Sequence, residues 1–287
     1  MKGRVDWRLP GIVVLGLIGF LFLREAFAGR LTLNPIALSF GTLEMHWYGL
    51  IIAGSLALAF PWAMHRARQR QIQLHDAEIV FMLAILGAIL GARSVYIVQN
   101  LPYYTAHLGE ILNLTTGGLS IHGALFGGLV AGALIAKKHS LPFWKLSDAA
   151  MPALLLGMIL GRFGNFTNGE LFGPPTNLPW KMFVPLFARP PELVDVQFFH
   201  PSFLYDAMLN AFVLILLLKS ERKMRFSGEL TLWFFVGISV TRFGVEFFRL
   251  GELSSIHLTS AQLISILLSL VALTLIVLTR RKAKTSL

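Results

Sequence analysis

The chain has 287 residues, of which 55% are hydrophobic and 14% are charged, and its mean hydropathy is +0.67. Since a soluble domain carries roughly a quarter charged residues, this composition excludes a soluble globular protein and indicates an integral membrane protein. No residue is a cysteine, which excludes a disulfide scaffold, a cysteine nucleophile and thiolate metal sites.

Apolar segments of about membrane-spanning length recur along the whole chain. Several show no alternation of period two, which favours helices over a membrane β-barrel. We therefore predict an all-α fold: a polytopic integral membrane protein with seven core transmembrane helices plus one N-terminal hydrophobic segment, and a periplasmic irregular region. The apolar segments are residues 11–23, 48–64, 79–98, 124–136, 149–160, 201–218, 230–248 and 263–278.

The first apolar segment allows two interpretations. It follows basic residues near the start of the chain and ends at Ala26-Phe27-Ala28, a pattern that resembles a signal peptide with a cleavage-like end. A short extra transmembrane helix fits the same residues. Both interpretations place residue 30 outside, so we divide the chain into an N-terminal hydrophobic segment, 1–29, and one membrane domain, 30–287.

The net charge of +10 would suit a nucleic-acid partner, but its distribution does not. Most lysines and arginines cluster at the N-terminus and after every second apolar segment, as the positive-inside rule requires of cytoplasmic loops. Topology and anionic lipid therefore explain the charge, and we expect the membrane and no nucleic acid as a partner. The clusters are Lys2/Arg4/Arg8, Arg66/Arg68/Arg70, Lys137/Lys138/Lys145, Lys219/Arg222/Lys223/Arg225 and Arg280/Arg281/Lys282/Lys284.

Four other arginines lie at or within the outer ends of apolar segments: Arg93, Arg162, Arg242 and Arg249. Each arginine inside a bilayer costs roughly 2.5–3.5 kcal/mol on insertion scales. Because the planar guanidinium suits a phosphate, the four together suggest an anionic ligand. Arg242, Glu246 and Arg249 follow the spacing i, i+4, i+7 of one helix face. A self-neutralising ion pair is the alternative interpretation of that face.

Residues 161–170 follow a long apolar segment, yet they include Arg162, Asn165, Asn168, Glu170 and several glycines. Backbone of this kind at membrane depth must be buried in protein or line a polar cavity. An ordinary glycine-rich interfacial loop is the alternative. The proline-rich segment 172–200 that follows should be ordered by turns rather than by helix, and should lie outside.

Three further side chains are candidates for the same site. Tyr48 opens an apolar segment, where an interfacial aromatic anchor is the plainer interpretation. His122 is flanked by glycines, and its unperturbed pKa of about 6.5 makes it a candidate acid–base group. His200 precedes Pro201 at the start of another segment, where helix capping is the default.

Taken together, these segments resemble the prolipoprotein diacylglyceryl transferase family of bacterial inner membranes. The motifs that carry the resemblance begin at His46, Gly91, Gly118, Gly161, Pro175, His200, Arg242 and Gln262, in the order HWYG, GAR, GLSIHG, GRFGNFTNGELFG, PTNLPW, HPSFLY, RFGVEFFR and QLIS. The stretch before His46 is longer than the family suggests. Phe203, Asp206, Asn100 and Ala261 depart from the family's usual residues, so a paralogue with a changed acceptor stays open.

The resemblance implies an enzyme that moves the diacylglyceryl group of phosphatidylglycerol to the lipobox cysteine of a preprolipoprotein and releases glycerol phosphate. It implies a multi-pass protein of the bacterial inner membrane with its site toward the outer leaflet. We expect neither a cofactor nor a metal, because the aspartates are scattered. The expected catalytic residues are His122, Arg162, Glu170 and Arg242, and the expected substrate-binding residues are Tyr48, Arg93, Asn165, Asn168, Gly173, His200, Glu246 and Arg249.

Mechanistically, the substrate thiol must lose its proton before it attacks, and we expect His122 to take it. Arginines beside the leaving phosphate would stabilise the charge that develops there. A lipid or anion transporter is the alternative of another class, since broken helices with buried arginines also occur in transporters. The chain shows no convincing internal repeat, which disfavours it.

Overall fold

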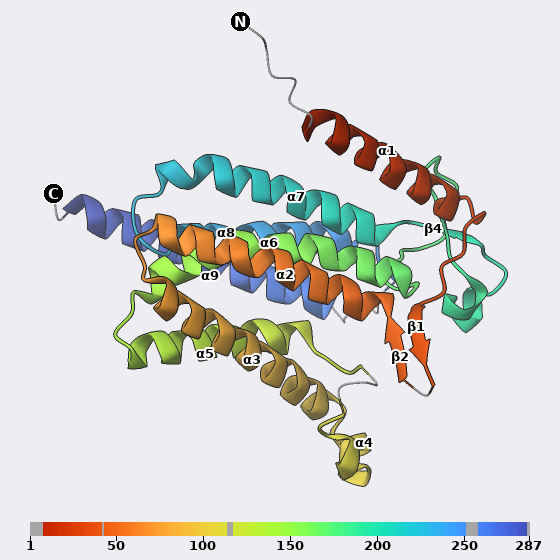
Figure 1. The fold of residues 1–287 in the computed structure, drawn as a ribbon, viewed down its shortest axis with the longest axis horizontal. Helices are drawn as coiled ribbons and strands as arrows, with labels where there is room; N and C mark the ends of the chain where they lie inside the picture. Colours follow the sequence, from red (N-terminus) through yellow and green to blue (C-terminus); the bar gives the residue numbers. More distant parts are fainter. Residues whose placement is uncertain (1–7, 42, 114–116, 251–257, 286–287) are drawn as a thin grey trace, which may run out of the picture. The chain divides into compact units, whose positions relative to one another are not determined.

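A computed structural model describes residues 8–41, 43–113, 117–250 and 258–285. The described chain is built mainly of helices, as predicted (Figure 1). They are α1 (Arg8–Phe27), α2 (Trp47–Gln69), α3 (Leu74–Gln99), α4 (Leu101–Ala106), α5 (Ile121–Lys138), α6 (Phe143–Thr167), α7 (Ser202–Ser220), α8 (Glu229–Glu246) and α9 (Ser260–Thr285).

Every predicted apolar segment coincides with one of the long helices, because each run is apolar enough to satisfy its backbone only internally. Among the described residues, 5 helices are long and apolar enough to cross a membrane. These helices support a polytopic membrane protein, and the count of seven plus one stays a prediction. The five are Trp47–Gln69, Leu74–Gln99, Phe143–Thr167, Ser202–Lys223 and Ser260–Lys282.

Two short sheets were not predicted. β1 (Ile36–Phe40) and β2 (Leu43–His46) form an antiparallel hairpin that leads directly into α2, with Ser39 opposite Glu44 (Figure 1). β3 (Met182–Phe183) pairs antiparallel with β4 (Phe198–Phe199) inside the proline-rich segment. Short 3-10 turns at Leu186–Ala188 and Pro191–Leu193 order the rest of that segment, as expected from its prolines.

The chain divides into two compact units. Unit 1 comprises Met1–Leu56, Leu155–Leu216 and Phe235–Thr274. Its interior is aromatic: Phe199 and Phe203 are fully buried, and the Phe166 ring stacks on Phe203 with centroids 4.9 Å apart. Phe27, at the end of α1, contacts Phe166 and Phe203 edge-on, so α1 contributes to this core.

Unit 2 comprises Ala57–Leu154, Leu217–Phe234 and Leu275–Leu287. Helices α3 and α5 run side by side in it (Figure 1). They approach so closely that a Cβ on Gly91 would lie 2.8 Å from the Cα of Gly127, and one on Gly123 would lie 2.8 Å from the Cβ of Val95. Glycine is therefore required at this crossing, as in close helix packing in membranes generally.

Candidate active site

Arg162 and Asp206 form an ion pair inside unit 1. Arg162 lies near the end of α6, and its Nε is 2.9 Å from Oδ2 of Asp206 on α7. The Asp206 side chain is 4% exposed and that of Arg162 is 19% exposed. Among the described contacts of Arg162, none uses its two Nη groups. Nη1 and Nη2 can therefore donate two parallel hydrogen bonds to an oxyanion.

Glu246 joins two further arginines. Its Oε2 lies 2.8 Å from Nη2 of Arg242 and 3.8 Å from Nε of Arg249. The sequence placed all three on one helix face, but α8 ends at Glu246 and Arg249 follows in a turn. Burial, together with the nearby charge of Arg242, lowers the pKa of Arg249 to about 10, although the carboxylate of Glu246 opposes this shift. Arg249 therefore remains a cation at neutral pH, in surroundings that would favour an added anion.

The two groups of charges are electrostatically coupled. Arg242 is within electrostatic range of both Arg162 and Asp206, and so is Arg249. Three arginines face two carboxylates, which leaves a surplus of one positive charge in a partly buried setting. We call these five side chains (Arg162, Asp206, Arg242, Glu246 and Arg249) the arginine cluster.

Glu170 is held by two amides rather than by an arginine. Asn165 Nδ2 donates to one of its carboxylate oxygens at 3.2 Å, and Asn168 Nδ2 donates to the other at 3.1 Å. The turn that allows this passes through Gly169, whose φ of +68° favours glycine. Asn165 and Asn168, both expected to bind substrate, thus place their amides on Glu170.

Tyr48 lies beside the same turn. It is the second residue of α2, and its ring packs so closely on α6 that a Cβ on Gly164 would lie 2.9 Å from Cδ2 of Tyr48. The Tyr48 hydroxyl is within electrostatic range of Glu170 and of Arg162. Tyr48 therefore lies within electrostatic range of both the Glu170 turn and the arginine cluster.

Gly173 and His200 form a tight junction next to the end of α8. The Gly173 amide donates to the carbonyl of His200 at 2.8 Å, and a Cβ on Gly173 would collide with Ser202 and with the carbonyl of Phe248. The His200 ring lies 3.1 Å from the hydroxyl of Tyr205. These contacts tie the proline-rich segment to the turn that carries Arg249.

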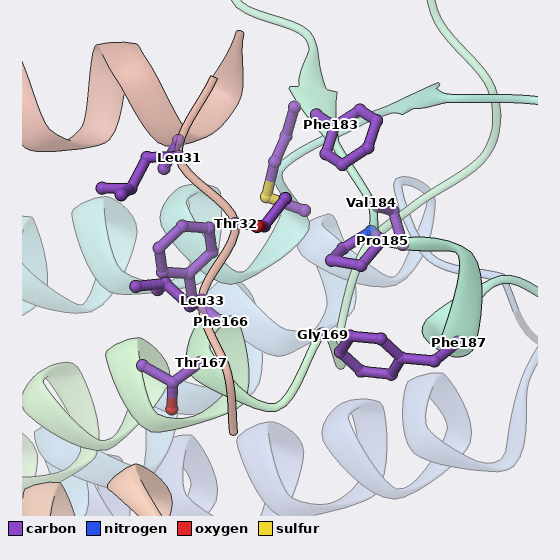
Figure 2. Close-up of a pocket in the computed structure, with 12 residues that line it drawn as sticks. Leu31, Thr32, Leu33, Phe166, Thr167, Gly169, Phe183, Val184, Pro185 and Phe187 are labelled. Atoms are coloured by element: carbon purple, nitrogen blue, oxygen red, sulfur yellow. The ribbon is translucent and has the colours of Figure 1, made fainter. Parts of the chain in front are cut away.

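The pocket in Figure 2 lies beside Gly169 but is too small to receive a substrate. Residues 31–33 run past it with Phe166 beside them, while Pro185 and Phe187 lie opposite, near Gly169 (Figure 2). Its volume is about 30 Å³, which has room for roughly one or two water molecules.

Two of the predicted site residues belong to unit 2. Arg93 is 5% exposed and directs its donors at backbone carbonyls: Nε to Ile111 at 2.8 Å and Nη2 to Glu110 at 2.5 Å. Its Nη1 donates to the carbonyls of Gly117 and Gly118. His122 is the second residue of α5; its side chain lies outside the described part of the structure.

Asp206 and Asn210 were missed as functional candidates. Asp206 was treated only as a departure from a family pattern, yet it is the partner of Arg162. The sequence feature that could have revealed them is their spacing: two polar side chains lie four residues apart in an apolar helix, and such residues within a membrane span usually face the interior and pair.

Among the described residues, no group of three or more His, Cys, Asp or Glu side chains could hold a metal ion.

Comparison with known proteins identifies the family. The family model described as prolipoprotein diacylglyceryl transferase matches residues 35–278. A protein of Thermosynechococcus vestitus named phosphatidylglycerol–prolipoprotein diacylglyceryl transferase is 38% identical over 231 residues, which are 80% of this chain and 86% of that protein. A protein of the same name from Thermotoga petrophila is 38% identical, and the match covers 89% of this chain and 88% of that protein. Another from Fervidobacterium nodosum is 36% identical, and the match covers 90% of this chain and 89% of that protein. The chain therefore belongs to the prolipoprotein diacylglyceryl transferase family.

Proposed function

We propose that this chain transfers the diacylglyceryl group of phosphatidylglycerol to a prolipoprotein, and that the arginine cluster binds the phosphate of the lipid. Membership of the family supports the reaction. The observation that carries the assignment of the site is the ion pair of Arg162: its Nε lies 2.9 Å from Oδ2 of the buried Asp206, and none of its described contacts uses the two Nη groups. A guanidinium held in this way is already oriented to bind a phosphate.

In the proposed reaction, the lipobox cysteine of the prolipoprotein supplies the nucleophile, since this chain contains no cysteine. The thiolate sulfur attacks the glyceryl carbon that carries the phosphate ester. A C–S bond forms as the C–O bond breaks, and glycerol phosphate leaves with the bonding electrons. The thiol proton goes to a base, for which we propose the imidazole of His122.

The arginine cluster acts on the leaving group. As the C–O bond breaks, negative charge grows on the phosphate oxygens, and a fixed cation there lowers the energy of the transition state more than that of the ground state. Arg162 and Arg242 are the proposed direct contacts. Glu246 orients Arg242, and Arg249 adds positive charge at the rim.

The remaining predicted residues take supporting roles. Glu170, clasped by Asn165 and Asn168, is proposed to bind the glycerol headgroup rather than to attack it. Tyr48, Gly173 and His200 are proposed to shape the part of the binding site that receives this headgroup. Arg93 donates to four backbone carbonyls that precede α5 in the chain. We therefore propose that Arg93 holds the start of α5 in place, and with it His122, the second residue of that helix.

The proposed setting is the bacterial inner membrane, with the arginine cluster toward the outer leaflet and the basic loops in the cytoplasm. The outer location suits an acceptor whose lipobox cysteine has crossed the membrane. Phosphatidylglycerol, prolipoprotein signal peptides with a lipobox cysteine, and the membrane itself are the proposed partners.

A transfer assay in detergent tests this function. Purified protein is mixed with phosphatidylglycerol labelled in its acyl chains and with a synthetic lipobox peptide; the thioether product and released glycerol phosphate are then quantified. A transferase yields both in equal amounts without a sealed membrane. A peptide that stays unmodified, together with lipid movement that needs sealed vesicles, would favour the transporter instead.

A further inference from the structure

Four side chains on three helices form a continuous polar chain in unit 1. It begins at the Arg162–Asp206 ion pair between α6 and α7, at 2.9 Å. Asn210 Nδ2, one turn further along α7, donates to the other oxygen of Asp206 at 2.5 Å. The hydroxyl of Thr241 on α8 lies 3.0 Å from Oδ1 of Asn210, to which it can donate, and 3.0 Å from the carbonyl of Ile238 in its own helix, the other acceptor of its proton. We call this series, Arg162–Asp206–Asn210–Thr241, the polar relay.

Its three inner members are buried. Asp206 is 3% exposed, Asn210 is 1% exposed and Thr241 is 6% exposed. Buried polar groups are costly unless each has a partner, and the cost is higher still in a membrane-spanning segment. Apolar side chains of the same size could pack at these positions without that cost. A series of buried polar side chains linked by hydrogen bonds and an ion pair therefore points to a role beyond packing.

The chemistry of each member gives the relay one direction. Asp206 as a carboxylate can only accept, so the amide of Asn210 must present its Nδ2 to Asp206 and its carbonyl to Thr241. A flipped amide would place an oxygen against the carboxylate. The second oxygen of Asp206 is thereby left to face Nε of Arg162. Each side chain fixes the orientation of the next.

Thr241 immediately precedes Arg242 on α8. We propose that Asp206, Asn210 and Thr241 are positioning residues: together they fix the guanidinium of Arg162 and set its place relative to Arg242. This inference rests on the proposed function, because it concerns the two arginines assigned to the lipid phosphate. It adds that phosphate binding depends on a buried relay whose members do not touch the substrate.

Thr241→Val tests the relay, because valine keeps the shape of threonine and removes its hydroxyl. Ser239→Ala is the matched control: Ser239 lies on the same helix, is 3% exposed, and its hydroxyl has no hydrogen-bond partner in the described part of the chain. We expect Thr241→Val to lower kcat/KM for phosphatidylglycerol by roughly tenfold, as loss of a buried hydrogen bond in a charged network should. The kcat/KM of Ser239→Ala should stay close to that of the parent protein. Thr241→Ser, which keeps the hydroxyl, should retain most of the parent kcat/KM.

A double variant separates positioning from general destabilisation. If the relay acts through Arg162, Thr241→Val should add little further loss of kcat/KM in an Arg162→Lys background, although its effect on the unfolding temperature remains. KM for the lipobox peptide should stay unchanged in the single variant. Should Thr241→Val fail to fold, Thr241→Ala takes its place in both comparisons.

The outcomes distinguish this inference from the proposed function. If the parent protein forms no thioether at all, the proposed function fails. If the parent is active and Thr241→Val matches Ser239→Ala, or if its loss is fully additive with that of Arg162→Lys, the relay is overturned while the function stands. A tenfold, non-additive loss that serine restores supports it.

Discussion

The carboxylate of Glu246 lies 2.8 Å from Nη2 of Arg242, four residues earlier on α8, at the last residue of the helix. A negative charge at a helix C-terminus is opposed by the helix dipole, so Glu246 is unfavourable there by itself. Its pairing with Arg242 and its approach to Arg249 offset this. The end of α8 therefore serves to hold two arginines rather than to stabilise the helix.

Replacement of Arg242 by alanine should reduce transfer by roughly 100-fold or more, because a charge-assisted contact to the developing phosphate is lost. Arg242→Lys should recover only part of the activity, since a point charge lacks the planar fork. The measurement is thioether formation by protein that has been shown to insert in the membrane. Arg30→Ala, which removes an exposed arginine, controls for the change in net charge.

Glu170→Gln should lower activity by roughly tenfold, because one of the two asparagine amides would then face an amide in place of a carboxylate oxygen. Glu192→Gln, an exposed glutamate of the proline-rich segment, is the control and should be close to neutral. Mass spectrometry of protein quenched during turnover should find no glyceryl ester on Glu170. A trapped ester there would identify Glu170 as a nucleophile and overturn its assigned role.

The topology can be tested by labelling single cysteines, since the parent chain has no thiol. The loops around Arg68, Lys138, Arg222 and Lys282 should be cytoplasmic, and residues 174–200 should lie outside. A cysteine at position 192 should react with an impermeant reagent in intact cells, and one at position 138 only after permeabilisation. Reaction at 138 from outside would place the arginine cluster in the wrong leaflet.

His122→Gln keeps hydrogen-bonding capacity and removes basicity, so it separates orientation from proton transfer. We expect a loss of roughly 100-fold or more at pH 7, the size typical of a lost general base. His139→Gln, at the other end of α5, is the matched control. Near-parental rates at pH 7 would show that His122 orients a substrate, and that the leaving phosphate or a water accepts the proton.

The sequence predicted the helices well and the contacts between them poorly. Hydropathy located each long helix, because an apolar run in a membrane has few alternatives to a helix. The Arg242–Glu246 pair also followed from spacing within one helix. The hairpin of β1 and β2 was missed, although Leu38, Phe40 and Leu43 flank a turn at Gly41, where φ is +62°.

The pairing of Arg162 with Asp206 could not be predicted, because the two residues are 44 positions apart on different helices and their contact depends on how those helices pack. The same holds for Arg93: its sequence position indicated an anion site, but the structure surrounds it with backbone carbonyls. A buried arginine can be satisfied by an ion, a carboxylate or a carbonyl. Only the folded environment distinguishes these cases.

The most direct test of the account is the transfer rate of Arg162→Ala and Arg162→Lys, with Arg30→Ala as the control, under saturating lipobox peptide. If Arg162 binds the phosphate, Arg162→Ala should lose transfer by roughly 100-fold or more and Arg162→Lys should be intermediate, while both proteins insert normally. Normal turnover by Arg162→Ala would contradict the assignment of the arginine cluster as the phosphate site.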